Sequence, residues 1–257
     1  MEVNASNLVI EHNLVSANGV SIGGASGIHL YASSADDPAG DGNTVRYNLT
    51  YANHDALTSD GNGIEIDQWC DGNDVSFNVA WGNDGAGIVV YDGNANRVAA
   101  NTLYGNGLDP AHTHGALGEL IVSGSASGVQ AGRPSANQVF DNLAVATLPG
   151  VPAFYVSDAA YALRAGATFG PNLLFNAAGG TLMRWSDSLT LDSASQIDQA
   201  TGSSGNLVRL PAFANAADPL AGGLRLSAYP GGTGTPLQGL TDLAGQAGGN
   251  GWSYFGA

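Results

Sequence analysis

A six-residue motif bounded by asparagines recurs along this 257-residue chain and constrains its fold more than any other feature. The clearest copy, Asn43–Asn48, reads Asn-Thr-Val-Arg-Tyr-Asn. Similar copies begin at Asn73, Asn96 and Asn137, and looser ones begin at Asn7 and Asn172. Successive copies are about 36, 30, 23, 41 and 35 residues apart, which is the range of solenoid repeats. The sequence therefore predicts a solenoid with a bare coil of about 23 residues and loops in its longer coils.

A second short strand follows most copies of the motif, and a glycine usually precedes it. These segments alternate with a period of two residues, as strands with one buried face do, and they are Gly27–Tyr31, Gly63–Asp67, Gly87–Tyr91, Glu119–Ser123 and Ala153–Ser157. A propeller needs four strands in each repeat, and no helical apolar period is present before residue 190. Inward asparagines at one corner of successive coils can bond to each other in a ladder. The pattern thus predicts an all-β, right-handed parallel β-helix.

The stretch from Asp60 to Asn78 resembles the pectin-lyase-like β-helix superfamily, whose repeats read much like Asn-x-Val-x-x-Asn followed by Gly-Ile-x-Val. Its continuation from Trp81 to Ile88 is also similar to bacterial members of that group. The resemblance covers roughly residues 4 to 190 and is specific for the fold. It implies a polysaccharide-active protein as an expectation, without identifying the reaction.

The chain is predicted to divide into β-helix coils over residues 1–190 and a C-terminal cap over 191–257. The cap is expected to contain a short helix over 192–200, with Asp192 or Ser193 as its N-cap, and extended segments after it. Such a cap would cover the open end of the core. No equivalent cap precedes Asn4, so we expect a missing upstream segment or another chain to cover that end.

The amino-acid composition limits the classes of molecule that this protein is expected to bind. The chain has 7 basic residues, none of them lysine, against 22 acidic ones, which argues against nucleic acid as a partner. No apolar run approaches the ~18 residues of a membrane span. The single cysteine, Cys70, excludes an intrachain disulfide and is expected to be a small buried core residue. A polysaccharide partner and a secreted or extracellular location are predicted, although the chain begins without a signal region.

Glu65 and Asp67 are the sharpest candidates for chemistry. They occupy outward positions i and i+2 of one strand, so their Cα atoms should be about 6.5–7 Å apart on one face. That spacing is near the lower edge of the range for the acid and base of an inverting glycosidase. His29 would lie one coil before Glu65, and we include it as a third catalytic candidate. The alternative is that both carboxylates are merely solvated.

Candidate substrate-binding residues surround this pair or lie on long loops. Tyr31, Tyr91, Gln68 and Trp69 are expected on the face of Glu65 and Asp67. A second outward column would present a platform for sugar rings, or a stack that protects the coil; its aromatic members are Tyr51, Trp81 and Tyr104. The longest insertion adds His112 and His114. Asp36, Asp37 and Asp41 form an acidic loop that is a candidate Ca²⁺ site or a flexible turn.

Three functions remain open at the level of sequence. The preferred hypothesis is a glycoside hydrolase that uses Glu65 and Asp67 and requires no cofactor. The second is a Ca²⁺-assisted lyase or epimerase that acts on uronate polymers, which the absence of lysine disfavours. The third is a non-catalytic carbohydrate-binding or surface structural module.

Overall fold

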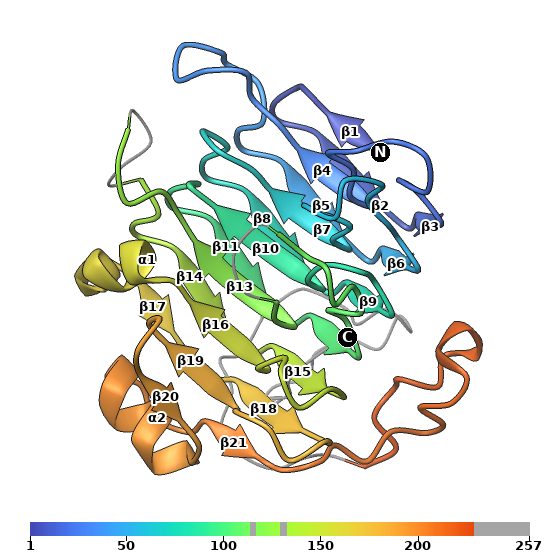
Figure 1. Ribbon diagram of the computed structural model, residues 1–257, viewed down its shortest axis with the longest axis vertical. Coiled ribbons are helices and arrows are strands. Elements are labelled where there is room, and N and C mark those ends of the chain that lie inside the picture. The colour runs from blue at the N-terminus through green and yellow to red at the C-terminus, as the bar shows by residue number, and fades with distance from the viewer. Residues whose placement is uncertain (114–116, 129–132, 229–257) are drawn as a thin grey trace.

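Three parallel β-sheets stacked coil upon coil form the body of the molecule (Figure 1). The structure is a computed structural model that describes residues 1–113, 117–128 and 133–228. Each coil contributes one strand to each sheet, and every pair of neighbouring strands is parallel except the last pair of sheet A. The predicted right-handed parallel β-helix is confirmed, with the handedness that strand–crossover–strand connections take.

The three sheets are named here by their strands. Sheet A contains β1 (Glu2–Val3), β4 (Ile28–Leu30), β7 (Ile64–Ile66), β10 (Ile88–Tyr91), β13 (Leu120–Ser123), β16 (Phe154–Val156), β19 (Met183–Trp185) and β20 (Thr190–Leu191). Sheet B contains β2 (Val9–Glu11), β5 (Thr44–Arg46), β8 (Asp74–Ser76), β11 (Arg97–Ala99), β14 (Gln138–Phe140) and β17 (Thr168–Phe169). Sheet C contains β3 (Leu14–Ser16), β6 (Leu49–Tyr51), β9 (Val79–Trp81), β12 (Thr102–Tyr104), β15 (Leu143–Ala146), β18 (Leu173–Asn176) and β21 (Leu207–Val208).

The core lies between the sheets and is filled by the inward residue or residues of each strand. In sheet A these are pairs of aliphatic side chains, and Ile28, Leu30, Ile64 and Ile66 are all completely buried. Cys70 is also completely buried within this core, as predicted. Burial raises the pKa of its thiol. The period-two pattern of the sequence therefore determines which side chains fill the solenoid.

Sharp corners connect the strands, and most corners place one residue in the left-handed region immediately before an asparagine. At two corners between sheets B and C this residue is aromatic: Tyr47 has φ 56° and Phe77 has φ 57°. Ordinary L-residues adopt this conformation at a cost, so neighbouring interactions must stabilise the corner. Stacking of the Tyr47 and Phe77 rings, with centroids 5.4 Å apart, is one such interaction.

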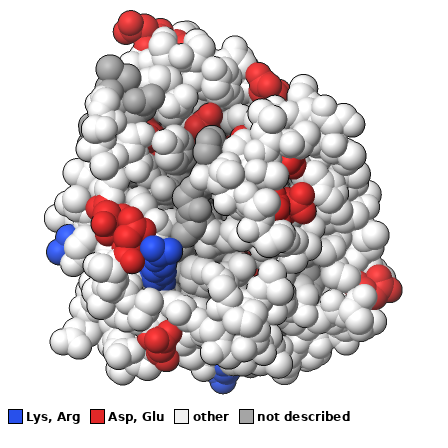
Figure 2. Space-filling model, viewed as in Figure 1, with Lys and Arg blue, Asp and Glu red and all other residues white. Residues whose placement is uncertain are grey.

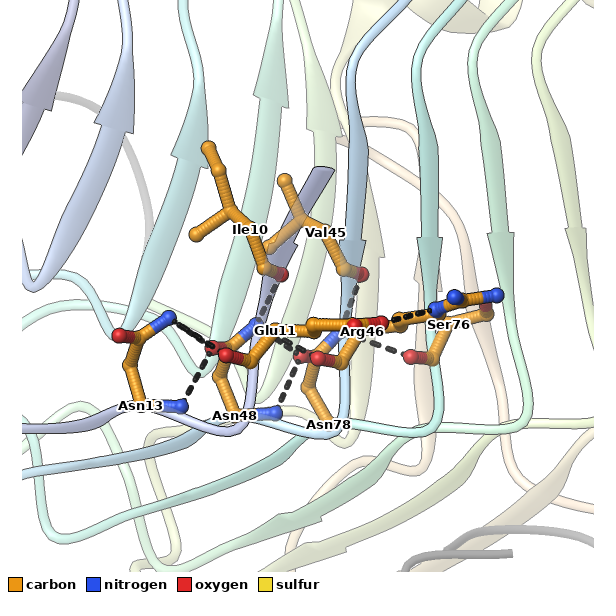
Figure 3. Close-up of polar contacts among 8 residues, drawn as sticks. All are labelled: Ile10, Glu11, Asn13, Val45, Arg46, Asn48, Ser76 and Asn78. Carbon is orange, nitrogen blue, oxygen red and sulfur yellow. Dashed lines mark hydrogen bonds and ion pairs between the residues drawn. The ribbon is translucent and has the colours of Figure 1, made fainter. Parts of the chain in front are cut away.

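The asparagine after each corner supplies the predicted ladder (Figure 3). The Nδ2 group of Asn13 donates to Oδ1 of Asn48 at 2.9 Å, and Asn48 donates in the same way to Asn78 at 3.0 Å. Nδ2 of Asn48 also donates to the backbone oxygen of Ile10 at 2.9 Å. The buried corner amides are thereby paired with each other and with backbone groups.

Three such ladders run along the molecule, one at each corner. The first two use the asparagines at the two ends of the sequence motif. The third lies after sheet C and was not part of the motif; its members are Asn18, Asn53, Asn83 and Asn106. All its amides donate toward the C-terminal end, so the last one needs an acceptor. Glu119 provides it, because its Oε2 accepts from Nδ2 of Asn106 at 2.6 Å.

The C-terminal region contains short helices and a returning segment. Its helical elements are α2 (Ala194–Thr201) and the 3₁₀ helix η2 (Pro219–Ala221), whereas α1 (Asp158–Ala162) and the 3₁₀ helix η1 (Arg164–Gly166) lie between β16 and β17. The predicted helix is confirmed as α2, with Ser193 as its N-cap. Phe213 packs edge-on against Tyr104, so the returning segment covers part of sheet C. The boundary at residue 190 stays a prediction. In the described residues, no helix is long and apolar enough to span a membrane.

Candidate functional site

The outward residues of sheet A stand in two columns, as the sequence register predicted. His29 pairs with Glu65, and Glu65 pairs with Val89, so these three form the first column over successive coils. Tyr91 lies two residues after Val89 on β10, beside the place of Asp67. The fold thus brings the three predicted catalytic residues to one place.

His29, Glu65 and Asp67 form a compact cluster. Nε2 of His29 lies 3.3 Å from Oδ2 of Asp67. One ligand-type atom from each of the three residues lies within 4.8 Å of the other two. Among the described residues, this is the one place where three or more such side chains meet closely enough to hold a metal ion.

The cluster is recessed but still open to solvent. Glu65 is 6% exposed, while the side chains of His29 and Asp67 are 11% and 15% exposed. Figure 2 shows one face of the molecule, on which the surface is hollowed and acidic groups outnumber basic ones. A small ion or one edge of a larger ligand can therefore approach the cluster.

Two polar residues that the sequence reasoning missed hold Glu65 in place. Oε2 of Glu65 accepts from Oγ of Ser26 at 2.6 Å and from Nδ2 of Asn62 at 3.1 Å. Ser26 and Asn62 each lie just before the glycine that leads into β4 or β7. A signal was present in the sequence, because the matching position of the next coil is the apolar Ala86.

The three side chains perturb one another electrostatically. Burial alone would lower the pKa of His29, but its hydrogen bond to Asp67 and the negative charges of Glu65 and Asp67 raise the pKa to about 9. Burial raises the pKa of Glu65, and the positive charge of His29 opposes that shift. At neutral pH the imidazole is therefore held as a cation between carboxyl groups.

The residues expected to flank the pair have different positions. The rings of Tyr31 and His29 meet edge to face at 5.8 Å, and the hydroxyl of Tyr91 is 3.0 Å from that of Ser125. Both tyrosines are half-buried beside the cluster. The expectation that Trp69 lies on the face of Glu65 and Asp67 with Gln68 is wrong, because β7 ends at Ile66. Trp69 instead has φ 63° and packs against the core, so the chain has already turned there.

The aromatic column is on sheet C, away from the cluster. Tyr51 and Trp81 stack face to face, with centroids 4.6 Å apart and planes 5° apart. One face of each ring is therefore covered by the other ring, and the pair does not form a continuous flat platform for sugars. Tyr104 is in contact with Phe213. This geometry favours a structural role for the column, and its role in sugar binding stays a prediction.

The remaining candidates that the structure describes do not join the cluster. Three groups donate to the carboxylate of Asp37, namely the backbone and hydroxyl of Ser33 and the backbone of Ala39, and they lower the pKa of Asp37 to about 2. Asp36 and Asp41 do not gather with it into a metal-type group within the described chain. His112 lies in the loop after β12, and His114 lies outside the described residues.

None of the seven arginines is part of the cluster. Arg46 and Arg97 are on sheet B, as predicted, where they pair with Glu11 at 2.7 Å and Asp74 at 2.8 Å. Arg184 is at the far end of sheet A, paired with Asp187. A lyase or epimerase would therefore have no arginine in the cluster to neutralise a uronate carboxylate.

Comparison with families of known proteins gives one finding that covers most of the chain. Residues 2–206 match the family model described as periplasmic copper-binding protein (NosD). No curated protein and no solved structure matches the chain.

Proposed function

The chain belongs to the family of periplasmic copper-binding proteins (NosD), and from this premise we propose that it is a non-catalytic periplasmic binding protein with a site for Cu²⁺ at His29, Glu65 and Asp67. The observation that carries the proposal is the convergence of one imidazole and two carboxyl groups within 4.8 Å. Two neighbouring coils create that convergence, because His29 lies on β4, Glu65 lies beside it on β7, and Asp67 directly follows β7.

The chemistry of these side chains fits a divalent copper ion. Imidazole nitrogen together with carboxylate oxygen is a donor set that suits Cu²⁺, whereas Cu⁺ prefers the soft sulfur of Cys or Met. The thiol of Cys70 is completely buried in the core and is not available to the cluster. Metal–ligand bonds are about 2 Å long, so ligand atoms within 4.8 Å of one another need only small side-chain rotations to meet at one ion.

Charge also favours a cation at this position. Two carboxyl groups lie in a recessed part of a protein with net charge −15, and within the described residues His29 is the basic group that lies beside them. A bound Cu²⁺ would supply the positive charge that the protonated imidazole otherwise supplies. His29 must lose its proton to become a ligand, so binding releases a proton.

Copper titration of variants tests this proposal. Isothermal titration calorimetry should show one tight Cu²⁺ site in the native protein and a loss of about 100-fold in affinity for His29→Ala. The matched control is His54→Ala, because the exposed side chain of His54 pairs with Asp84 at 2.8 Å and is not part of the cluster. Equal affinity in the native protein and His29→Ala would contradict the proposal.

Glycan hydrolysis is the second candidate, and the pairing of Glu65 with Asp67 supports it. Burial raises the pKa of Glu65, which favours the protonated form that a general acid needs, while Asp67 could act as the base. Against a panel of polysaccharides, hydrolysis would give new reducing ends without the absorbance of unsaturated uronates. Glu65→Gln and Asp67→Asn should each abolish that activity. Activity that survives both substitutions would exclude the pair as catalysts.

A further inference from the structure

We propose that Ser26 and Asn62 determine the metal preference of the cluster by leaving Glu65 a single oxygen with which to bind an ion. The inference rests on the proposed metal-binding function. Ser26 and Asn62 would not bind the ion themselves. They would act through Glu65, by determining which of its oxygens is available.

The hydrogen bonds to Glu65 are unequally divided between its two oxygens. Oε2 accepts from Ser26 at 2.6 Å and from Asn62 at 3.1 Å. A carboxylate oxygen has two lone-pair sites, so these donors occupy both sites of Oε2. Oε1 accepts no hydrogen bond within the part of the chain that the structure describes. Glu65 can therefore offer Oε1 to an ion, but it cannot offer both oxygens without losing a buried hydrogen bond.

The two donors are themselves fixed. The backbone nitrogen and Nδ2 of Asn62 donate to Oγ of Ser26 at 3.1 and 3.3 Å. Oδ1 of Asn62 accepts from the backbone nitrogen of Ala86 at 2.7 Å. Ser26 is 3% exposed and Asn62 is 5% exposed, so water does not replace these bonds cheaply. The arrangement ties Glu65 to the backbone of the next coil.

A one-oxygen Glu65 limits which ions the cluster can hold. Ca²⁺ takes about 6–8 oxygen ligands and often uses both oxygens of a carboxylate. The cluster instead offers one nitrogen and two single oxygens, which suits a small ion with few ligands and an affinity for imidazole. Ser26 and Asn62 thus favour Cu²⁺ and disfavour Ca²⁺.

The test measures a metal-preference ratio, defined as the affinity for Cu²⁺ divided by the affinity for Ca²⁺. Calorimetric titration of the full chain with Cu²⁺ alone and with Ca²⁺ alone gives this ratio for the native protein, Ser26→Ala and Asn62→Ala. We expect each variant to lower the ratio about tenfold or more, because Glu65 gains freedom to bind through both oxygens. Ser26→Thr keeps the hydroxyl and should restore the native ratio.

A matched control is available in the neighbouring loop. Ser59 donates to Oδ2 of Asp55 at 2.7 Å and does not contact the cluster, so Ser59→Ala should leave the ratio unchanged. An unchanged ratio in folded Ser26→Ala and Asn62→Ala overturns the inference, as does a parallel loss of both affinities. If Asn62→Ala does not fold, Asn62→Ser replaces it. Failure of the native protein to bind Cu²⁺ would instead refute the proposed function.

Discussion

The outer face of sheet A has two halves that share one backbone pattern but carry opposite chemistry. In the polar half, His29 and Glu65 occupy the first outward column, preceded three residues earlier by Ser26 and Asn62. In the apolar half, the same column holds Val89, Ile121 and Tyr155, and the positions three residues earlier are Ala86, Gly118 and Pro152.

The comparison shows that an outward residue and its neighbour three positions earlier change together. Val89, Ile121 and Tyr155 form a small apolar cluster with Ala86, and each of the three is less than 9% exposed. A carboxylate there would lack a donor, whereas Glu65 has two. A recessed charge is thus tolerated where the preceding turn provides hydrogen bonds.

The largest expected effect comes from converting the polar half into the apolar one. The double variant Glu65→Val with Asn62→Ala copies the coil of Val89 and Ala86. Cu²⁺ binding should fall by about 100-fold or more, since a ligand and its orienting partner are both removed. The free energy of unfolding without metal should fall by about 1–3 kcal/mol, because His29 loses one of its carboxyl partners and the backbone nitrogen of Ala86 loses its acceptor. Calorimetric titration and urea unfolding check the two outcomes.

The reverse change should destabilise the protein. Val89→Glu places a carboxylate in the apolar cluster of Ala86, Ile121 and Tyr155 without a donor. We expect the free energy of unfolding at pH 7 to fall by about 3–5 kcal/mol, as for an uncompensated buried charge. Adding Ala86→Asn should recover part of this loss in urea unfolding. If Val89→Glu alone is as stable as the native protein, the comparison between the halves fails.

Glu119 is a buried acidic residue in the apolar half, and we expect it to have a smaller effect on the free energy of unfolding that depends on pH. It ends the third ladder, and burial raises its pKa to about 8 although Asn106 donates to it. The folded protein then keeps this proton over a range in which the unfolded chain, with an ordinary pKa near 4.5, has lost it. Stability should therefore fall as the pH rises from about 4.5 to 8, by about 2–4 kcal/mol in total.

Urea unfolding over that pH range tests the role of Glu119. In Glu119→Gln this decline should disappear, even if the amide pairs less well with Asn106 at every pH. The control is Glu11→Gln, which removes the surface partner of Arg46 and should keep the decline. A decline of equal size in Glu119→Gln would assign it to other groups.

Much of the fold could be predicted because it depends on local repetition. The spacing of asparagines and the alternation of aliphatic residues gave the coils, the register and the convergence of His29 with Glu65 and Asp67. The directions in which the ends of the strands turn could not be predicted in this way. Trp69 follows the strand in sequence, yet its left-handed conformation turns it toward the core.

Sequence alone determined the coil and its columns, because a period of two residues and a recurring corner fix which side chains leave the core. It did not determine how those columns interact, because that depends on contacts between residues about 23 to 41 positions apart. Only the tertiary structure showed that Ser26 and Asn62 converge on one oxygen of Glu65. The sequence left Tyr51 and Trp81 open as a sugar platform or a protective stack, and the structure shows that their rings lie face to face with centroids 4.6 Å apart. A sequence repeat specifies the register of the strands. Hydrogen bonding and burial depend in addition on which loops of neighbouring coils come into contact.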